Sequence, residues 1–202
     1  MGKSGRRHRL RDGRVVQVRV PDPGADLNRL YVFFGALPDG IRNTMRYDLR
    51  DREFLRRRLG QIDGAEHWRV IAEVDGRVVG DGTMDREPFA WTRHVAELRC
   101  VVDPAFQHLG IGTLIWEALV ERAAGAGIER LFTELTAEQR SAMDAVQDAG
   151  FVLEAVRARH AKDPDGRLHD VFIFSNDLAM VWKRLEEHVR ELDEPAYRSG
   201  EY

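Results

Sequence analysis

The stretch that decides the fold is residues 96–113, which read AELRCVVDPAFQHLGIGT. The apolar run up to Val102 predicts a strand, and the two glycines at 110 and 112 predict the start of a helix after a short connection. Glycines let the backbone approach a ligand closely, and the first N–H groups of a helix have no internal partners. With the positive end of the helix dipole they form an anion site, so a phosphorylated ligand is expected.

Several phosphate-binding loops share this glycine pattern. A Rossmann loop would place a ribose-binding acid near Glu134, which follows Gly112 by 22 residues. However, Ile115 occupies the third glycine position, and the turn from strand to helix is long. A Walker loop needs Gly-Lys-Ser/Thr, which is missing here. The pattern that remains is Gln107-x-x-Gly110-x-Gly112.

The sequence around this unit alternates between strand and helix patterns. Asp75-Gly76 predicts the tight turn of a hairpin, and Asp51 predicts a helix N-cap. The order implies an α/β (α+β) fold with one mixed sheet covered by helices on both faces. The predicted strands are 15–20, 68–74, 77–84, 95–102, 130–135, 151–161 and 168–175, and the predicted helices are 26–37, 51–59, 110–124, 137–149 and 176–193.

The glutamine-glycine pattern resembles the pyrophosphate-binding motif of the GCN5-related N-acetyltransferase (GNAT) family, which binds acetyl-CoA. The order of predicted elements matches this family over residues 15–175. A helix that runs into Gly150-Phe151, and His169-Asp170 ahead of a closing strand, are similar as well. The resemblance implies a GNAT fold, with a mostly antiparallel sheet, a central parallel pair and, in this chain, an extra C-terminal helix.

Two further features look like the bacterial protein-lysine acetyltransferases of the Pat type. Glu97 lies ten residues before Gln107, and the first helix contains Phe33-Phe34-x-x-Leu37. The resemblance implies an acetyl-CoA-dependent N-acetyltransferase that acts on a primary amine, either a protein lysine or a small molecule. In this family the amine attacks acetyl-CoA directly within a ternary complex.

The resemblance also implies roles for individual residues. Thr113 can give a hydroxyl to phosphate, His108 contributes its backbone, and Gln139 matches loosely an asparagine that touches acetyl-CoA. The residues expected to bind acetyl-CoA are Cys100, Val101, Val102, Gln107, His108, Leu109, Gly110, Ile111, Gly112, Thr113 and Gln139.

Glu97 is the candidate general base. A lysine-like amine is almost fully protonated at neutral pH, and supplying its neutral form costs about 4 to 5 kcal/mol. Burial among apolar neighbours would raise the pKa of the Glu97 carboxyl toward a useful value. The alternative is a structural carboxylate paired with an arginine such as Arg99 or Arg93.

One position departs from the family pattern. Many members have a tyrosine four residues before the Gly-Phe pair, where it can protonate the leaving thiolate, but this chain has Val146. Either water is the acid, or CoA leaves as a thiolate, or the protein is a non-catalytic sensor or interaction module that binds acetyl-CoA. Cys100 is expected to be a buried thiol rather than a nucleophile.

The chain is expected to form one domain with two appendages. Residues 1–14 predict a flexible basic tail, residues 15–176 the acetyltransferase domain, and residues 177–202 a C-terminal helix and tail. That helix carries apolar residues at a heptad spacing, at Leu178, Trp182, Leu185, Val189 and Leu192. Such a stripe docks on its own domain or pairs two subunits into a homodimer.

Composition argues against several kinds of partner and site. The 202 residues carry 31 Lys and Arg against 34 Asp and Glu, a net charge of −3, which argues against a nucleic-acid partner. Apolar runs are too short for a membrane span, so no membrane partner is expected. A single cysteine indicates a cytoplasmic protein, and the scattered histidines predict no metal site.

Overall fold

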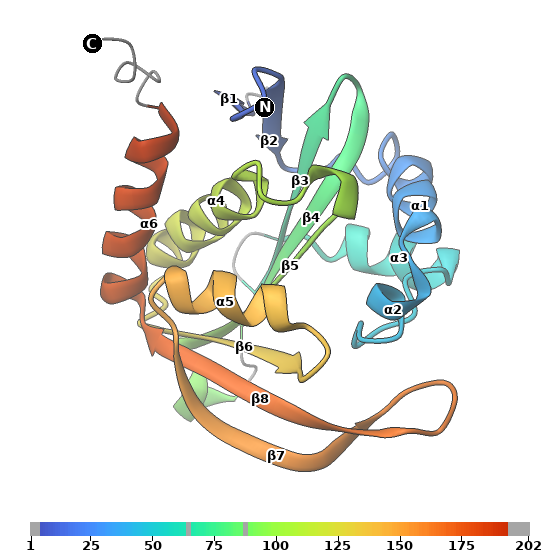
Figure 1. The fold of residues 1–202 in the computed structure, drawn as a ribbon, viewed down its shortest axis with the longest axis vertical. Helices are drawn as coiled ribbons and strands as arrows, with labels where there is room; N and C mark the ends of the chain where they lie inside the picture. The colour runs from blue at the N-terminus through green and yellow to red at the C-terminus, as the bar shows by residue number, and fades with distance from the viewer. Residues whose placement is uncertain (1–4, 64–65, 87–88, 194–202) are drawn as a thin grey trace, which may run out of the picture.

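One open sheet of eight strands organises the chain (Figure 1). The computed structural model describes residues 5–63, 66–86 and 89–193. The strand order across the sheet is β1-β2-β3-β4-β5-β6-β8-β7. The strands are β1 (Arg6–Arg9), β2 (Val15–Arg19), β3 (His67–Val74), β4 (Arg77–Arg86), β5 (Val95–Val102), β6 (Arg130–Thr136), β7 (Val152–Lys162) and β8 (Leu168–Asp177).

The middle of the sheet holds its parallel pair. β5 and β6 run parallel, and the other neighbours are antiparallel, as the family resemblance implies. The pairing of β5 with β6 covers three positions and ends at Glu97, opposite Phe132. β5 itself continues to Val102 alongside β4. The two strands therefore separate at Glu97 and leave one backbone edge of β5 without a strand beside it.

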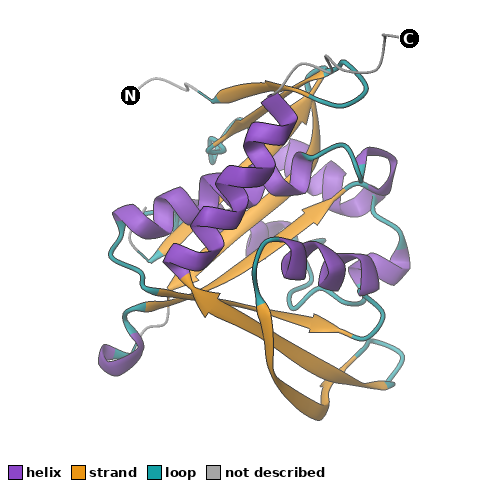
Figure 2. Cartoon of the chain, turned by 60° about the vertical axis from the view of Figure 1, so that its left-hand side comes forward, coloured by secondary structure: helices purple, strands orange, loops and turns teal. Residues whose placement is uncertain are grey.

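Helices cover both faces of the sheet, as predicted (Figures 1 and 2). The short α1, α2 and α3 lie on one face, where Leu30, Phe34 and Leu55 form a core. On the other face α4, α5 and α6 bury a larger core that includes Ile115 and Leu119. The helices are α1 (Leu27–Ala36), α2 (Asp39–Arg42), α3 (Arg52–Gly60), α4 (Ile111–Gly125), α5 (Arg140–Asp148) and α6 (Leu178–Asp193).

Two glycines of β4 bring α4 close to the sheet. A Cβ atom at Gly82 would lie 2.2 Å from Cγ2 of Ile115, and one at Gly80 would lie 2.8 Å from Cδ1 of the same side chain. Contacts this short would force the Ile115 side chain to move, so the two glycines allow the present close packing. The close packing fixes where α4 begins relative to the end of β5.

The local predictions of turns and caps are confirmed. Asp75 and Gly76 both have positive φ angles, 49° and 75°, as the tight hairpin turn between β3 and β4 requires. The Asp51 side chain accepts hydrogen bonds from the backbone N–H groups of Glu53 and Phe54, which caps α3.

The prediction of a flexible tail is wrong for residues 5–14. Arg6–Arg9 pair with β2 as an edge strand, and Leu10 is buried. The Arg6 guanidinium also reaches Glu121 of α4 at 2.7 Å. Backbone hydrogen bonds to β2, with one anchoring leucine, therefore hold an arginine-rich segment that has no apolar alternation. Residues 1–4 lie outside the described residues.

The C-terminal helix docks on its own domain. The buried side chains of α6 are Val181, Leu185 and Val189, and they belong to the core shared with α4. Leu178 and Trp182 of the predicted heptad stripe are only partly buried at its margin, because the buried line follows a spacing of four residues. Packing within the chain thus accounts for the described part of the apolar stripe. Residues 194–202, and the side chain of Leu192, are not described.

Candidate active site

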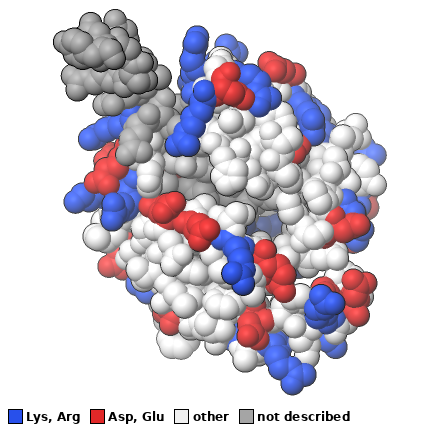
Figure 3. Space-filling view, in the orientation of Figure 1, with Lys and Arg blue, Asp and Glu red and all other residues white. Residues whose placement is uncertain are grey.

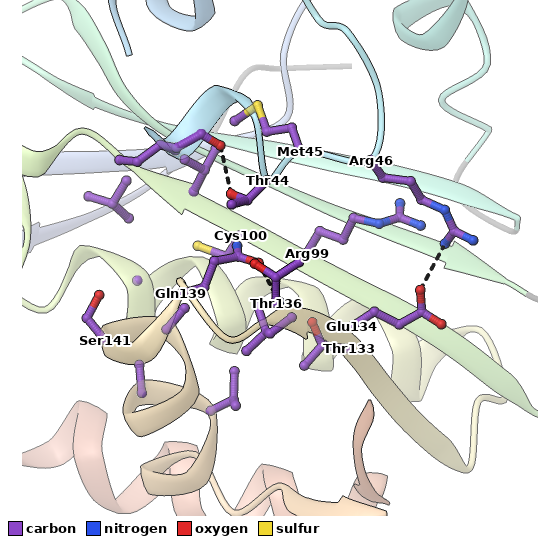
Figure 4. A pocket seen from close by; sticks show the side chains of 18 of the residues that line it. Thr44, Met45, Arg46, Arg99, Cys100, Thr133, Glu134, Thr136, Gln139 and Ser141 are labelled. Atoms are coloured by element: carbon purple, nitrogen blue, oxygen red, sulfur yellow. Dashed lines mark hydrogen bonds and ion pairs between the residues drawn. The ribbon is translucent and has the colours of Figure 1, made fainter. Parts of the chain in front are cut away.

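A cavity of about 1030 Å³ lies where β5 and β6 separate. Segments far apart in the sequence line it. The loop before α4 and helix α5 form one side, and the loop after α2 forms the other. Figure 4 shows Thr44 and Met45 of that loop facing Gln139 and Ser141 at the start of α5 across the cavity. The molecular surface is hollowed here, with charges of both signs around it (Figure 3).

The loop between β5 and α4 is held in shape by local hydrogen bonds. Asp103 donates its N–H to the Val79 carbonyl at 2.9 Å, and its side chain accepts from Ala105. The Gln107 side-chain amide donates to the Val102 carbonyl at 3.2 Å. Gln107 thereby ties the loop to the end of β5.

The start of α4 points unsatisfied donors at the cavity. Gly110 has φ of 93° and begins the helix, whose first internal bond runs from Leu114 N–H to the Gly110 carbonyl. The N–H groups of the residues before Leu114 have no partner within the helix. Since Gly112 and Thr113 line the cavity, this end of α4 has the donors and the dipole of an anion site.

The structure brings most of the predicted site residues together, but not all. Leu109 and Ile111 do not line the cavity, because Ile111 is buried in the core and Leu109 packs against that core. Only their backbone is on the loop side, so a side-chain role in binding is not supported. The predicted residues that line the cavity are Glu97, Cys100, Val101, Val102, Gln107, His108, Gly110, Gly112, Thr113 and Gln139.

Glu97 lies at the point where the two strands part. It is 4% exposed, and its Oε2 accepts hydrogen bonds from Arg46, at 2.7 Å, and from Arg99. Burial raises the pKa of its carboxyl, with a smaller contribution from the nearby Glu134 carboxylate, while Arg99 and Arg46 oppose the rise. The pairing with Arg99 matches the structural alternative considered above, and the raised pKa matches the catalytic one.

The sequence that forms this site matches a known protein family. A family model described as "Acetyltransferase (GNAT) family" matches residues 36–151, which are more than half of the chain and include Glu97 and the loop between β5 and α4. The chain belongs to the GNAT family. It is an enzyme of the N-acetyltransferase class.

Solved structures share this GNAT fold at low sequence identity. The GNAT domain of S. lividans PAT has a TM-score of 0.72 at 21% identity, covering 86% of this chain and 96% of that one. The yncA protein of Salmonella typhimurium, solved with acetyl-CoA, has a TM-score of 0.69 at 17%, covering 81% and 94%. A ribosomal-protein-alanine N-acetyltransferase of Brucella melitensis has 0.69 at 23%, covering 79% and 98%.

Several residues of this GNAT cavity were not predicted from sequence. Arg46, from the loop between α2 and α3, reaches Glu97 across 51 positions of the chain. Glu134, which the sequence offered only as a Rossmann acid, lies on β6 beside Glu97 and pairs with Arg157 of β7 at 2.9 Å. No local pattern marks these partners, because they meet only when the sheet forms.

Valine stands at the position where many GNAT members have a tyrosine, as the sequence predicts. Val146 lies on α5, 3% exposed, and lines the cavity without a hydroxyl group.

In the described part of the chain, no group of three or more His, Cys, Asp and Glu side chains is arranged to hold a metal ion. None of the described helices is long and apolar enough to cross a membrane.

His169 ties two parts of the GNAT cavity wall together. Its Nε2 lies 2.9 Å from Asp163 in the turn between β7 and β8, and its Nδ1 lies 2.8 Å from Glu138 before α5. Hydrogen bonds to Asp163 and Glu138 raise the pKa of the His169 imidazole above 6.5. Both contacts are ion pairs only when the ring is protonated.

We therefore expect His169→Gln to lower the melting temperature at acidic pH only. The raised pKa means that the stabilisation is fully present below about pH 6.5 and is lost as the pH rises through the folded-state pKa. Thermal melts from pH 5.5 to 9 measure the difference between wild type and variant. His160→Gln, on exposed β7, is the control, and a difference independent of pH would contradict the expectation.

Proposed function

We propose that this GNAT enzyme transfers the acetyl group of acetyl-CoA to a primary amine, which attacks directly in a ternary complex. The observation that carries the proposal is the placement of Glu97. This buried carboxylate lies in the same cavity as the donor-rich start of α4, at the opening between β5 and β6. One cavity thus combines a base with an anion site.

The residues present fit acetyl-CoA. Gly110 has a left-handed backbone, and a Cβ atom at Gly112 would meet only Val102, at 4.0 Å, so this loop leaves room for a bulky anion. Gln107 to Thr113 would hold the pyrophosphate, and the free edge of β5 at Cys100 to Val102 would hold the pantetheine arm. When bound, acetyl-CoA supplies an acetyl group activated as a thioester.

Glu97 would take the proton that the acceptor amine must lose. Burial raises the pKa of Glu97 above that of an exposed glutamate and so brings it closer to the pKa of an amine. This makes proton transfer from the amine less unfavourable. Backbone N–H groups on the free edge of β5 would stabilise the negative charge that builds on the carbonyl oxygen.

Cys100 does not fit the role of a nucleophile. It lines the cavity, but burial raises the pKa of its thiol far above neutral pH, so the reactive thiolate is scarce. Direct attack by the amine is therefore favoured over an acetyl-cysteine step. With Val146 in place of the usual tyrosine, water would protonate the thiolate that leaves.

The acceptor could be a protein amine or a small molecule. Similar structures include the PAT domain and an enzyme named for the alanine of a ribosomal protein. We also propose that the enzyme belongs to the Pat-like subgroup, is cytoplasmic and forms a homodimer. For the homodimer, α6 would have to contribute a surface other than Val181, Leu185 and Val189, which are buried against α4.

An amine panel tests the proposal. We expect release of the CoA thiol from acetyl-CoA with at least one of three acceptor classes: alkylamines and polyamines, lysine peptides, and peptides with a free N-terminus. A thiol-reactive dye measures release, and mass spectrometry confirms the acetylated amine. Acetyl-CoA that binds tightly without release across the whole panel would instead support the non-catalytic sensor.

A further inference from the structure

Two carboxylates face the acceptor side of the cavity, and one arginine bridges them. Arg46 Nη1 lies 2.7 Å from Oε2 of Glu97 and 3.9 Å from Oε2 of Glu134. Figure 4 shows the Arg46 side chain reaching from its loop toward Glu134, with Arg99 alongside. A cationic nitrogen therefore lies between the proposed base and a second carboxylate.

The two sides of this contact differ in exposure. The Glu97 and Glu134 side chains are 6% and 17% exposed and belong to β5 and β6, whereas the Arg46 side chain is 49% exposed and comes from a loop. Ion pairs with a half-exposed partner contribute little to stability. The contact with Arg46 would therefore weaken acceptor binding by a factor of about five or less. The carboxylates are fixed, and the arginine can be displaced.

The charges around the pair select for a cation. Oε2 of Glu97 also accepts a hydrogen bond from Arg99, and Oε1 of Glu134 pairs with Arg157 at 2.9 Å. If a monovalent ammonium replaces the Arg46 guanidinium, the charge between the carboxylates stays the same. A neutral or anionic group would leave the buried Glu97 and the partly buried Glu134 without the cation that now bridges them.

A second observation in the same cavity points to a polar ligand. Arg69 and Asp81 are each 5% exposed and line the cavity on the same face of the sheet. Oδ1 of Asp81 forms an ion pair with Nε of Arg69 at 3.4 Å, but among the described residues neither this oxygen nor Nη1 of Arg69 has a hydrogen-bond partner. Buried polar atoms normally have partners, so these two favour a ligand with hydrogen-bonding groups over an apolar one.

We propose that Glu97 and Glu134 form the binding site for the ammonium group of the acceptor, and that Arg46 occupies this site until the acceptor displaces it. The inference rests on the proposed acetyl transfer and narrows its substrate class to amines that are cations at neutral pH, such as alkylamines. Glu134 binds and orients the ammonium, while Glu97 removes its proton.

The test compares two acceptors of similar size, an alkylamine that is cationic at neutral pH and an arylamine that is neutral. Glu134→Gln is expected to raise the KM of the alkylamine about tenfold, the effect of losing one hydrogen bond to a charged group. Arg46→Ala is expected to lower that KM by up to about fivefold. The KM of acetyl-CoA and the KM of the arylamine are expected to stay unchanged.

Matched controls are Arg50→Ala, in the same loop but outside this cavity, and Glu154→Gln, on the exposed strand β7. The proposal is overturned if both site variants keep the wild-type KM for the alkylamine, or if the arylamine is affected equally. Failure of acetyl transfer itself gives a different result, in which wild type releases no CoA thiol with either amine. In that case calorimetry of the alkylamine with wild type and Glu134→Gln still decides whether the ammonium site exists.

Discussion

Replacement of Glu97 by glutamine is expected to lower kcat by about 10²- to 10⁴-fold, the contribution of a general base. Glutamine keeps the size of the side chain and can still hydrogen-bond, but it cannot accept the proton of the acceptor. Binding of acetyl-CoA, measured by calorimetry, is expected to stay unchanged, because Glu97 lies five residues before the end of β5, whereas the start of α4 follows that end.

Glu73→Gln is the matched control. Glu73 is also a partly buried carboxylate held by two arginines, Arg19 and Arg29, but it lies outside the cavity. Its replacement should cost stability without a loss of kcat in the folded protein. Wild-type kcat in Glu97→Gln, with full occupancy by acetyl-CoA, would remove Glu97 from the mechanism.

The pH dependence of Glu97 gives the same assignment an independent readout. The base works only when deprotonated, and burial raises its pKa above the ordinary 4.5 of a glutamate. The acidic limb of the kcat/KM profile is therefore expected above pH 4.5 and should be absent in Glu97→Gln.

Replacement of Gly112 by valine is expected to raise the KM of acetyl-CoA by about 10- to 100-fold, the range for losing a hydrogen bond to a charged group. A Cβ atom at this position meets only Val102, at 4.0 Å, so the helix can form normally. The branched side chain would instead fill the space in front of the α4 N–H groups and keep a phosphate away from them.

Gly125→Val, at the other end of α4, is the control. There a new Cβ atom meets only the Arg122 side chain, also at 4.0 Å, and lies far from the cavity lining. Both variants should keep the cooperative unfolding of wild type, measured by circular dichroism. An unchanged KM in a folded Gly112→Val variant would show that phosphate is not bound at the start of α4.

The sequence predicted the framework well, because that framework depends on local rules. The turn at Asp75-Gly76, the cap at Asp51 and the strand–loop–helix unit of residues 96–113 follow from short-range backbone preferences. The edge strand β1 did not follow from them, since backbone pairing with β2 leaves no apolar alternation in its side chains. The helix α2 was missed because Pro38-Asp39-Gly40 predicts only an end to α1, yet it also begins the next turn.

The candidate site was predictable on its α4 side and hidden on the acceptor side. Glu97 and Gln107 lie in one contiguous stretch, so the family resemblance identifies both from the local sequence. A contiguous stretch cannot tell which side chains turn into the core, as those of Leu109 and Ile111 do, which leaves only their backbone for the proposed pyrophosphate site. Arg46 and Glu134 come from distant segments, and their contact depends on how a loop folds over the sheet.

The short pairing of β5 with β6 has a consequence for cohesion. The strands on either side of the opening are directly hydrogen-bonded through only the three positions that end at Glu97. A molecule that spans the opening touches both half-sheets, so its binding free energy adds to the work of pulling them apart. At 100 times its Kd, such a ligand adds about 2.7 kcal/mol to the free energy of unfolding. If acetyl-CoA binds along the free edge of β5 as proposed, it would take the place of the missing strand contact and link the two half-sheets.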